Sequence, residues 1–90
     1  MLKPVFQNKC KKSLKLCEKR NYDISLFDEV AKIILTGKPL PKKYMPHKLT
    51  GEWDGRWDCH IKDDWVLIYR YDFANGNVIF EDTGTHSDLF

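Results

Sequence analysis

The stretch G-R-W-D-C-H-I-K-D-D-W-V-L-I-Y-R-Y-D-F-A-N-G-N-V-I-F-E-D, residues 55–82, decides the fold. Polar and apolar residues alternate at its start, with the two-residue period of a half-buried strand. Residues 65–71 are almost all apolar or aromatic, which predicts a second strand in the middle of a sheet. The Asn-Gly pair at 75–76 is a strong hairpin signal, and a third strand is predicted over 78–82.

Two amphipathic helices are predicted before this stretch, over residues 7–20 and 25–36. In both segments apolar residues recur at spacings of three and four, which places them on one face of a helix. Asp23 or Ser25 can accept hydrogen bonds from the free amides at the start of the second helix. The two helices are expected to form an antiparallel hairpin.

The remaining segments complete a small α+β domain. Residues 2–6 predict a further strand, which Pro4 confines to a sheet edge because proline has no amide hydrogen. Residues 38–54 contain three prolines, so we expect a long loop without regular elements. The chain is therefore predicted to form one domain, residues 1–90, with two N-terminal helices packed on a mainly antiparallel sheet of three or four strands.

The composition is that of a globular protein, with 42% hydrophobic and 13% aromatic residues. No apolar run approaches the ~20 residues that a membrane helix needs. The first residues lack the apolar core of a secretion signal. The three cysteines include no C-x-x-C pair and favour buried thiols over disulfides, so a cytoplasmic protein is expected.

The net charge of +2 is divided unevenly along the chain. Residues 1–50 contain 12 Lys and Arg against 4 Asp and Glu, and residues 51–90 contain 3 against 9. A basic half of this kind attracts a polyanion such as RNA, or an acidic protein partner. A solvated, lysine-rich helix surface has the same composition, so charge alone leaves these interpretations open.

Three histidines, His47, His60 and His86, are the candidates for chemistry because imidazole exchanges protons near neutral pH. If the last three strands form a meander, His60 near the end of one strand and His86 after another converge. His47, in the preceding loop, can then close over them. Alternation places Asp58 on the same strand face as His60, and a turn beyond His60 brings Asp64 back towards it.

This residue set suits metal-independent cleavage of RNA. The 2′-hydroxyl must lose a proton to attack the phosphorus, the leaving 5′-oxygen must gain one, and cations must offset the phosphate charge. A zinc site is conceivable from the residue types, but no pair of ligands is followed by a second pair at the usual spacing. Histidines with purely structural roles remain an alternative. Phosphate-binding loops, dinucleotide fingerprints and nucleophile elbows are absent, so no cofactor is expected.

Three segments of the chain resemble the YafQ-like branch of the RelE/ParE superfamily of bacterial toxin–antitoxin toxins. They are P-H-K-L-T-G-E-W at 46–53, D-C-H-I-K-D-D-W-V-L-I-Y at 58–69 and T-G-T-H-S-D-L-F at 83–90. The predicted order of one strand, two helices and three strands is also the order of that family. The resemblance implies a RelE-like fold and a ribosome-dependent endoribonuclease, an mRNA interferase that inhibits translation. Its implied partners are a cognate antitoxin, the ribosome and mRNA.

The resemblance also implies which residues form the active site. The implied catalytic residues are His47, His60, Asp64 and His86, and the implied RNA-binding or supporting residues are Asp58, Arg56, Lys48, Lys62 and Phe90. His86 is the first candidate for proton transfer, as acid or as base, while Asp64 would orient a histidine and Phe90 would position a base. The family pattern does not assign the individual proton-transfer steps to the other two histidines.

Two positions depart from the family pattern. Trp57 stands where these toxins often have arginine, and Arg56 is expected to replace it from the polar strand face. Asp82 stands where arginine often precedes the last motif, which leaves Lys48 or Lys62 to supply a cation. Two other functions stay open: a non-catalytic ParE-like toxin that binds DNA gyrase, and a protein-interaction domain with structural histidines. The ParE-like branch lacks this histidine set.

Overall fold

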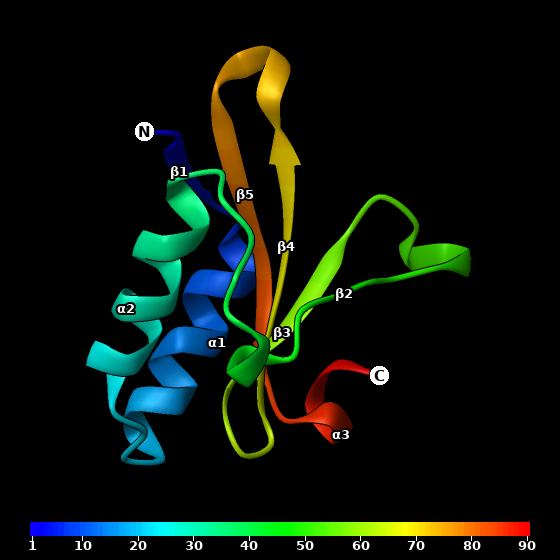
Figure 1. Cartoon of the computed structure of the whole chain (residues 1–90). Coiled ribbons are helices and arrows are strands. Elements are labelled where there is room, and N and C mark those ends of the chain that lie inside the picture. The colour runs from blue at the N-terminus through cyan, green and yellow to red at the C-terminus, as the bar shows by residue number, and fades with distance from the viewer.

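A five-stranded mixed sheet lies at the centre of the computed structural model, which describes residues 1–90 (Figure 1). The strand order is β1-β5-β4-β3-β2, where β1 pairs with β5 in parallel and the other pairs are antiparallel. The strands are β1 (Lys3–Phe6), β2 (His47–Lys48), β3 (Trp57–Lys62), β4 (Trp65–Asp72) and β5 (Asn77–Gly84). The predicted α+β fold is confirmed, with β4 in the middle and β1 at an edge.

The sheet has one strand more than the three or four that were predicted. The additional strand, β2, lies inside the segment 38–54, where His47 pairs with Asp58 and Lys48 pairs with Trp57. Two short 3-10 helices, Lys42–Tyr44 and Gly51–Trp53, flank it. The prediction of a loop without regular elements was therefore wrong, because β2 forms through pairing with a later strand and has no local periodicity of its own.

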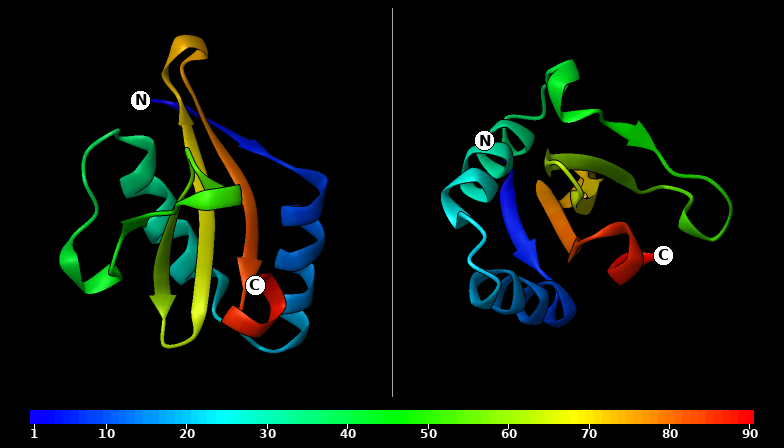
Figure 2. Two further views of the ribbon diagram at one scale, coloured as in Figure 1. Left: turned by 90° about the vertical axis from the view of Figure 1, so that its right-hand side faces the viewer. Right: turned by 90° about the horizontal axis from the view of Figure 1, so that it is seen from below.

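The two predicted helices, α1 (Asn8–Lys19) and α2 (Ile24–Leu35), run antiparallel and cover the same face of the sheet (Figures 1 and 2). Asp23 caps α2 by accepting a hydrogen bond from the backbone amide of Ser25 at 3.0 Å. The lysines of α1 point to solvent, while its two cysteines face the sheet. None of the helices has the length and apolar character needed to cross a membrane.

The main core fills the space between the helices and the sheet. Side chains of α2 such as Phe27 and Ile34 pack there against residues of the central strands such as Leu67 and Phe80. The three cysteines are free and buried in this core, as predicted. Burial raises the pKa of the Cys10 and Cys59 thiols to about 12, so they pack as small apolar groups.

The opposite face of the sheet, called the outer face below, has no layer of long helices. A short helix, α3 (His86–Leu89), follows β5 and lies on this side (Figure 2). Its Leu89 packs on Val66 and Ile68 of β4 in a small second core. Because successive strand residues point to opposite faces, the β4 residues that alternate with these two belong to the main core; they are Trp65, Leu67 and Tyr69. Leu49 and Trp53 pack on this second core, and polar and charged side chains also lie on the outer face.

Candidate active site on the outer face

The outer face brings two of the three histidines into contact and places the third beside them. His86 is the first residue of α3, and its ring centroid lies 5.1 Å from that of His60 on β3. His47 on β2 reaches the same face one strand further out, where its Nδ1 lies 2.8 Å from Oδ1 of Asp58. Asp58 precedes His60 by two residues and therefore shares its strand face.

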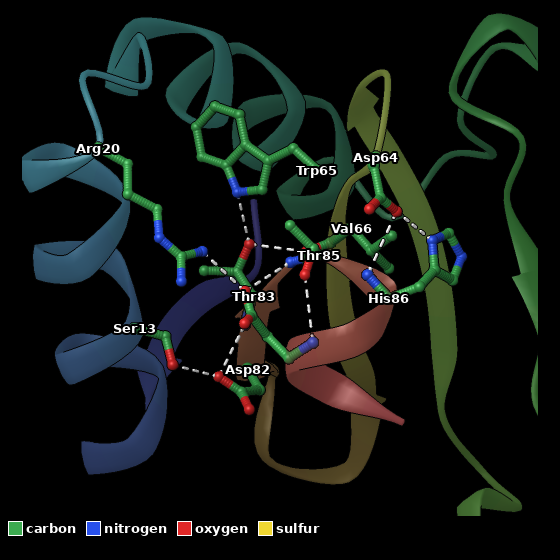
Figure 3. Close-up of polar contacts among 10 residues, drawn as sticks. Ser13, Arg20, Asp64, Trp65, Val66, Asp82, Thr83, Thr85 and His86 are labelled. Carbon is green, nitrogen blue, oxygen red and sulfur yellow. Dashed lines mark hydrogen bonds and ion pairs between the residues drawn. The ribbon is translucent and has the colours of Figure 1, made fainter.

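Asp64 holds His86 at two points, as Figure 3 shows. Its carboxylate accepts a hydrogen bond from the backbone amide of His86 at 3.2 Å and also contacts the ring Nδ1. These hydrogen bonds lower the pKa of the Asp64 carboxyl, so it stays ionised through the neutral range. The sequence predicted that Asp64 would lie near His60, and His60 is close enough to contribute to the lowered pKa of Asp64, while the hydrogen-bonded partner is His86.

His60 is held by the backbone of the same turn. Its Nδ1 lies 3.0 Å from the carbonyl oxygen of Asp63, which has a left-handed backbone conformation with φ of 47°. A carbonyl oxygen only accepts hydrogen bonds, so Nδ1 of His60 is the donor. In all three histidines a protein oxygen thus contacts Nδ1, which leaves each Nε2 available to a substrate.

The helix that carries His86 is tied to α1 at the end of the sheet. Thr85 and Asp88 form a reciprocal capping box at the start of α3. Arg20 at the end of α1 donates a hydrogen bond to the Asp88 carboxylate at 2.8 Å; Figure 3 labels Arg20 and Thr85. The Arg20 hydrogen bond is the largest cause that lowers the pKa of Asp88 to about 2. Gly84 lies so close to Asp88 that an added Cβ would be 2.9 Å from the carboxylate. Sequence reasoning missed this arrangement.

Asp82, one of the two departures from the family pattern, points away from the histidines. Its carboxylate accepts a hydrogen bond from the Ser13 hydroxyl at 2.5 Å, and Lys9 lies 3.4 Å away, both on α1 (Figure 3 shows Ser13). The side chain is buried at the boundary between α1 and the sheet. Its negative charge is therefore compensated on the helix side and does not face the outer surface.

The three cations expected near the histidines lie in different places. The ammonium of Lys48 lies 5.6 Å from the ring centroid of Trp57, which packs against the main core, so Lys48 faces away from His47. Lys62 lines a pocket beside the start of α2. Only Arg56 shares the outer face, where its Nε donates to Glu81 at 2.7 Å.

Two aromatic residues border the histidines. The ring of Phe90 lies 6.2 Å from His86 and meets Trp53 edge-on at 5.4 Å, measured between ring centroids. Phe90 is 56% exposed, so its ring is accessible on the outer face. Phe90 therefore lies beside His86, as expected if it positions a base. Trp53 was not among the predicted site residues.

The site is an open surface. None of the three histidines lines any of the five larger pockets of the molecule. No group of three or more histidine, cysteine, aspartate or glutamate side chains is arranged to hold a metal ion. An open row of imidazoles with free Nε2 atoms can exchange protons with a substrate that is long and held from outside.

Comparisons with known proteins identify the family of the chain. Residues 2–90 match the family described as the bacterial toxin of the type II toxin–antitoxin system, YafQ. The mRNA interferase toxin YafQ of Escherichia coli K12 is 38% identical over 80 residues, which are 88% of this chain and 85% of that protein. A copper-bound mutant toxin from Helicobacter pylori has 30% identity and a TM-score of 0.94, with both chains covered completely. In the E. coli DinJ–YafQ toxin–antitoxin complex, the matching chain has 34% identity and a TM-score of 0.87, covering 100% of this chain and 99% of that one.

Proposed function

The chain belongs to the YafQ family of type II toxins, and on this premise we propose that it is an mRNA interferase that cuts mRNA on the ribosome with its outer-face histidines. The observation that carries the proposal is the shared orientation of the three imidazoles, each with Nδ1 on a protein oxygen. The enzyme is an endoribonuclease that arrests translation in the cytoplasm, where bacterial mRNA is read.

His60 and His86 form the acid–base pair of this mechanism. One imidazole accepts the proton of the 2′-hydroxyl on Nε2 as the O2′–P bond forms. The other donates a proton from Nε2 to the 5′-oxygen as the P–O5′ bond breaks. The products are a 2′,3′-cyclic phosphate and a free 5′-hydroxyl, so no water or cofactor is consumed. The 5.1 Å between the two ring centroids places both imidazoles within reach of one phosphate bound over them.

The other predicted residues support this pair. Asp64 orients His86 through its contacts with the ring Nδ1 and the backbone amide. His47, oriented by Asp58, contacts the phosphate from the β2 side. Phe90 offers an exposed ring for base stacking, which is worth ~1–3 kcal/mol per base in proteins that bind single strands.

The basic face of α1 supports the proposed partners. Lys9 pairs with Asp82, and the other lysines of the helix are exposed on the side that faces away from the sheet; they are Lys11, Lys12, Lys15 and Lys19. Such a face attracts ribosomal RNA, and it also attracts an acidic segment of an antitoxin. The E. coli relative forms a complex with the antitoxin DinJ, and we propose a cognate antitoxin for this chain as well.

The test is cleavage of an mRNA bound to purified ribosomes, followed by primer extension. The His86→Ala variant should cleave ~10²–10⁴-fold more slowly, which is the usual contribution of a general acid or base. Lys32→Gln, an exposed change on α2, serves as the matched control and should cleave like the wild type. Unchanged cleavage by a folded His86→Ala protein would remove His86 from the mechanism, and absence of cleavage by the wild type would refute the function.

A further inference from the structure

A buried glutamate on β5 holds two arginines from two other parts of the sheet. Glu81 is only 9% exposed. Its Oε1 accepts a hydrogen bond from Nε of Arg56 at 2.7 Å, and its Oε2 accepts one from Nε of Arg70 at 2.9 Å. Arg56 precedes β3 and Arg70 lies on β4, so the three residues form a row across three neighbouring strands.

The charge of this cluster exceeds what Glu81 requires. A buried carboxylate needs compensation, and one arginine supplies it. The second arginine gives the three residues a net charge of +1. Both guanidinium groups bond to Glu81 through Nε alone, and their side chains are 32% and 38% exposed. Their terminal amino groups are therefore free to form the paired hydrogen bonds that arginine makes with phosphate oxygens.

The position of the cluster suits RNA at some distance from the bond that is cut. Arg56 and His60 are four residues apart in the sequence, so their Cα atoms are separated by roughly 13 Å on an extended strand. Glu81 of β5 holds the Arg56 guanidinium, so we place the phosphate that Arg56 contacts beside the scissile one. The Arg56 guanidinium also lies 5.9 Å from the ring centroid of Trp53, so an aromatic surface adjoins the cations. Cations beside aromatic rings are typical of surfaces that bind single-stranded nucleic acid.

We propose that Arg56 and Arg70, held in place by Glu81, bind a backbone phosphate of the RNA strand that flanks the scissile phosphate. This inference rests on the proposed function and extends its site: it adds Arg70 and Glu81 to the residues that bind RNA. Glu81 is a positioning residue because it acts through the arginines. The site fixes the direction in which the strand crosses the outer face towards His60 and His86.

The test measures binding of a single-stranded 2′-O-methyl RNA oligonucleotide, which cannot be cleaved, by fluorescence anisotropy over a range of salt concentrations. Arg70→Gln reduces the cluster to one neutral ion pair, so Glu81 keeps a partner and the fold is retained. Because each phosphate contact on a single strand contributes about 0.7 to the slope of log K against log salt, the slope should fall by about 0.7. Lys32→Gln removes the same charge elsewhere and should leave the slope unchanged.

An unchanged slope in Arg70→Gln, or no binding of the oligonucleotide to the wild type at low salt, would overturn the inference. A second measurement needs no variant. The Nε–H signals of Arg56 and Arg70 in the ¹⁵N spectrum of the wild type should shift when the oligonucleotide is added, and constant signals would also overturn it. Cleavage of ribosome-bound mRNA by the wild type is measured in parallel. Normal cleavage with an unchanged slope rejects this phosphate site alone, whereas absent cleavage rejects the proposed function itself.

Discussion

At the scale of single residues, the fold decides which nitrogen of each histidine has a protein partner. The oxygens on Nδ1 come from three different sources: Asp58 for His47, a backbone carbonyl for His60 and Asp64 for His86. No common sequence motif encodes this shared orientation. The sequence identified the histidines and Asp64, but the partner of Asp64 depends on how tightly the chain turns after β3. A left-handed residue at position 63 makes that turn, and periodicity does not reveal it.

Replacing Asp64 by alanine should disable His86 while leaving the fold intact. The ring loses the contact at Nδ1 and rotates, so cleavage should slow by on the order of 10²-fold, the lower range for a misplaced acid or base. Single-turnover cleavage on programmed ribosomes measures this effect. The matched control is Asp63→Asn, because Asp63 contacts His60 only through its backbone and asparagine tolerates a left-handed conformation. Equal rates for the two variants would contradict the role given to Asp64.

At the scale of elements, helix α3 is too short to be stable alone and depends on its anchors. A single turn of helix is unfavourable without tertiary contacts. Leu89 packs on the sheet, the capping box closes the first turn, and Arg20 joins that turn to α1. His86 therefore takes its position from residues that are far from it in the sequence.

The hydrogen bond between Arg20 and Asp88 should stabilise α3 only above the pH at which the Asp88 carboxyl becomes protonated. Its pKa is about 2 in the fold against an ordinary 3.8, so the stabilisation is complete above 3.8 and is lost as the pH falls towards 2. In Arg20→Gln the main cause of the lowered pKa is gone, and α3 should loosen at a higher pH than in the wild type. An NMR titration of the Asp88 carboxyl, with amide exchange of Phe90, measures both effects. Arg20→Lys keeps the charge and should behave more like the wild type; a carboxyl titration unaltered by Arg20→Gln would refute the anchor.

The same elements show what periodicity predicts and what it omits. Helices α1 and α2 follow from spacings of three to four residues and strand β3 from alternation. Strands β1 and β4 follow from apolar runs, and β5 follows from the Asn-Gly hairpin signal before it. Helix α3 was missed, although the spacing of Thr85 and Asp88 is the capping-box signal. Strand β2 has two residues and forms only because β3 is present, so no local pattern identifies it.

At the scale of the whole molecule, the two faces of the sheet have separate tasks. The helix face holds the main core, and the outer face holds the histidines and arginines. The family resemblance read from the motifs was confirmed by the match over residues 2–90. The ion pair between Arg70 and Glu81 was not predicted, because it joins two strands and no local sequence pattern indicates which side chains meet across them. The orientation of Asp82 towards α1 also depends on packing that no motif describes.

This separation predicts that stability and chemistry respond to different substitutions. Ile34 is completely buried in the main core, so Ile34→Ala should lower the free energy of unfolding by ~2–5 kcal/mol. Urea denaturation measures this loss, while cleavage by the protein that remains folded should be unchanged per molecule. Leu16 on α1 is 46% exposed, and Leu16→Ala should cost much less. Similar losses for both variants would contradict the assignment of the core.

The pairing of β5 between β1 and β4 has a consequence for biosynthesis. Ribosomes release a polypeptide from its N-terminal end, so β5 is the last of the five strands to emerge. Until β5 emerges, β1 lacks its parallel partner and Ser13 of α1 lacks its hydrogen-bond acceptor, Asp82. Helix α3, which carries His86, follows β5 and has not yet been made. We therefore expect a nascent chain to have no nuclease activity until its own message has been translated beyond β5.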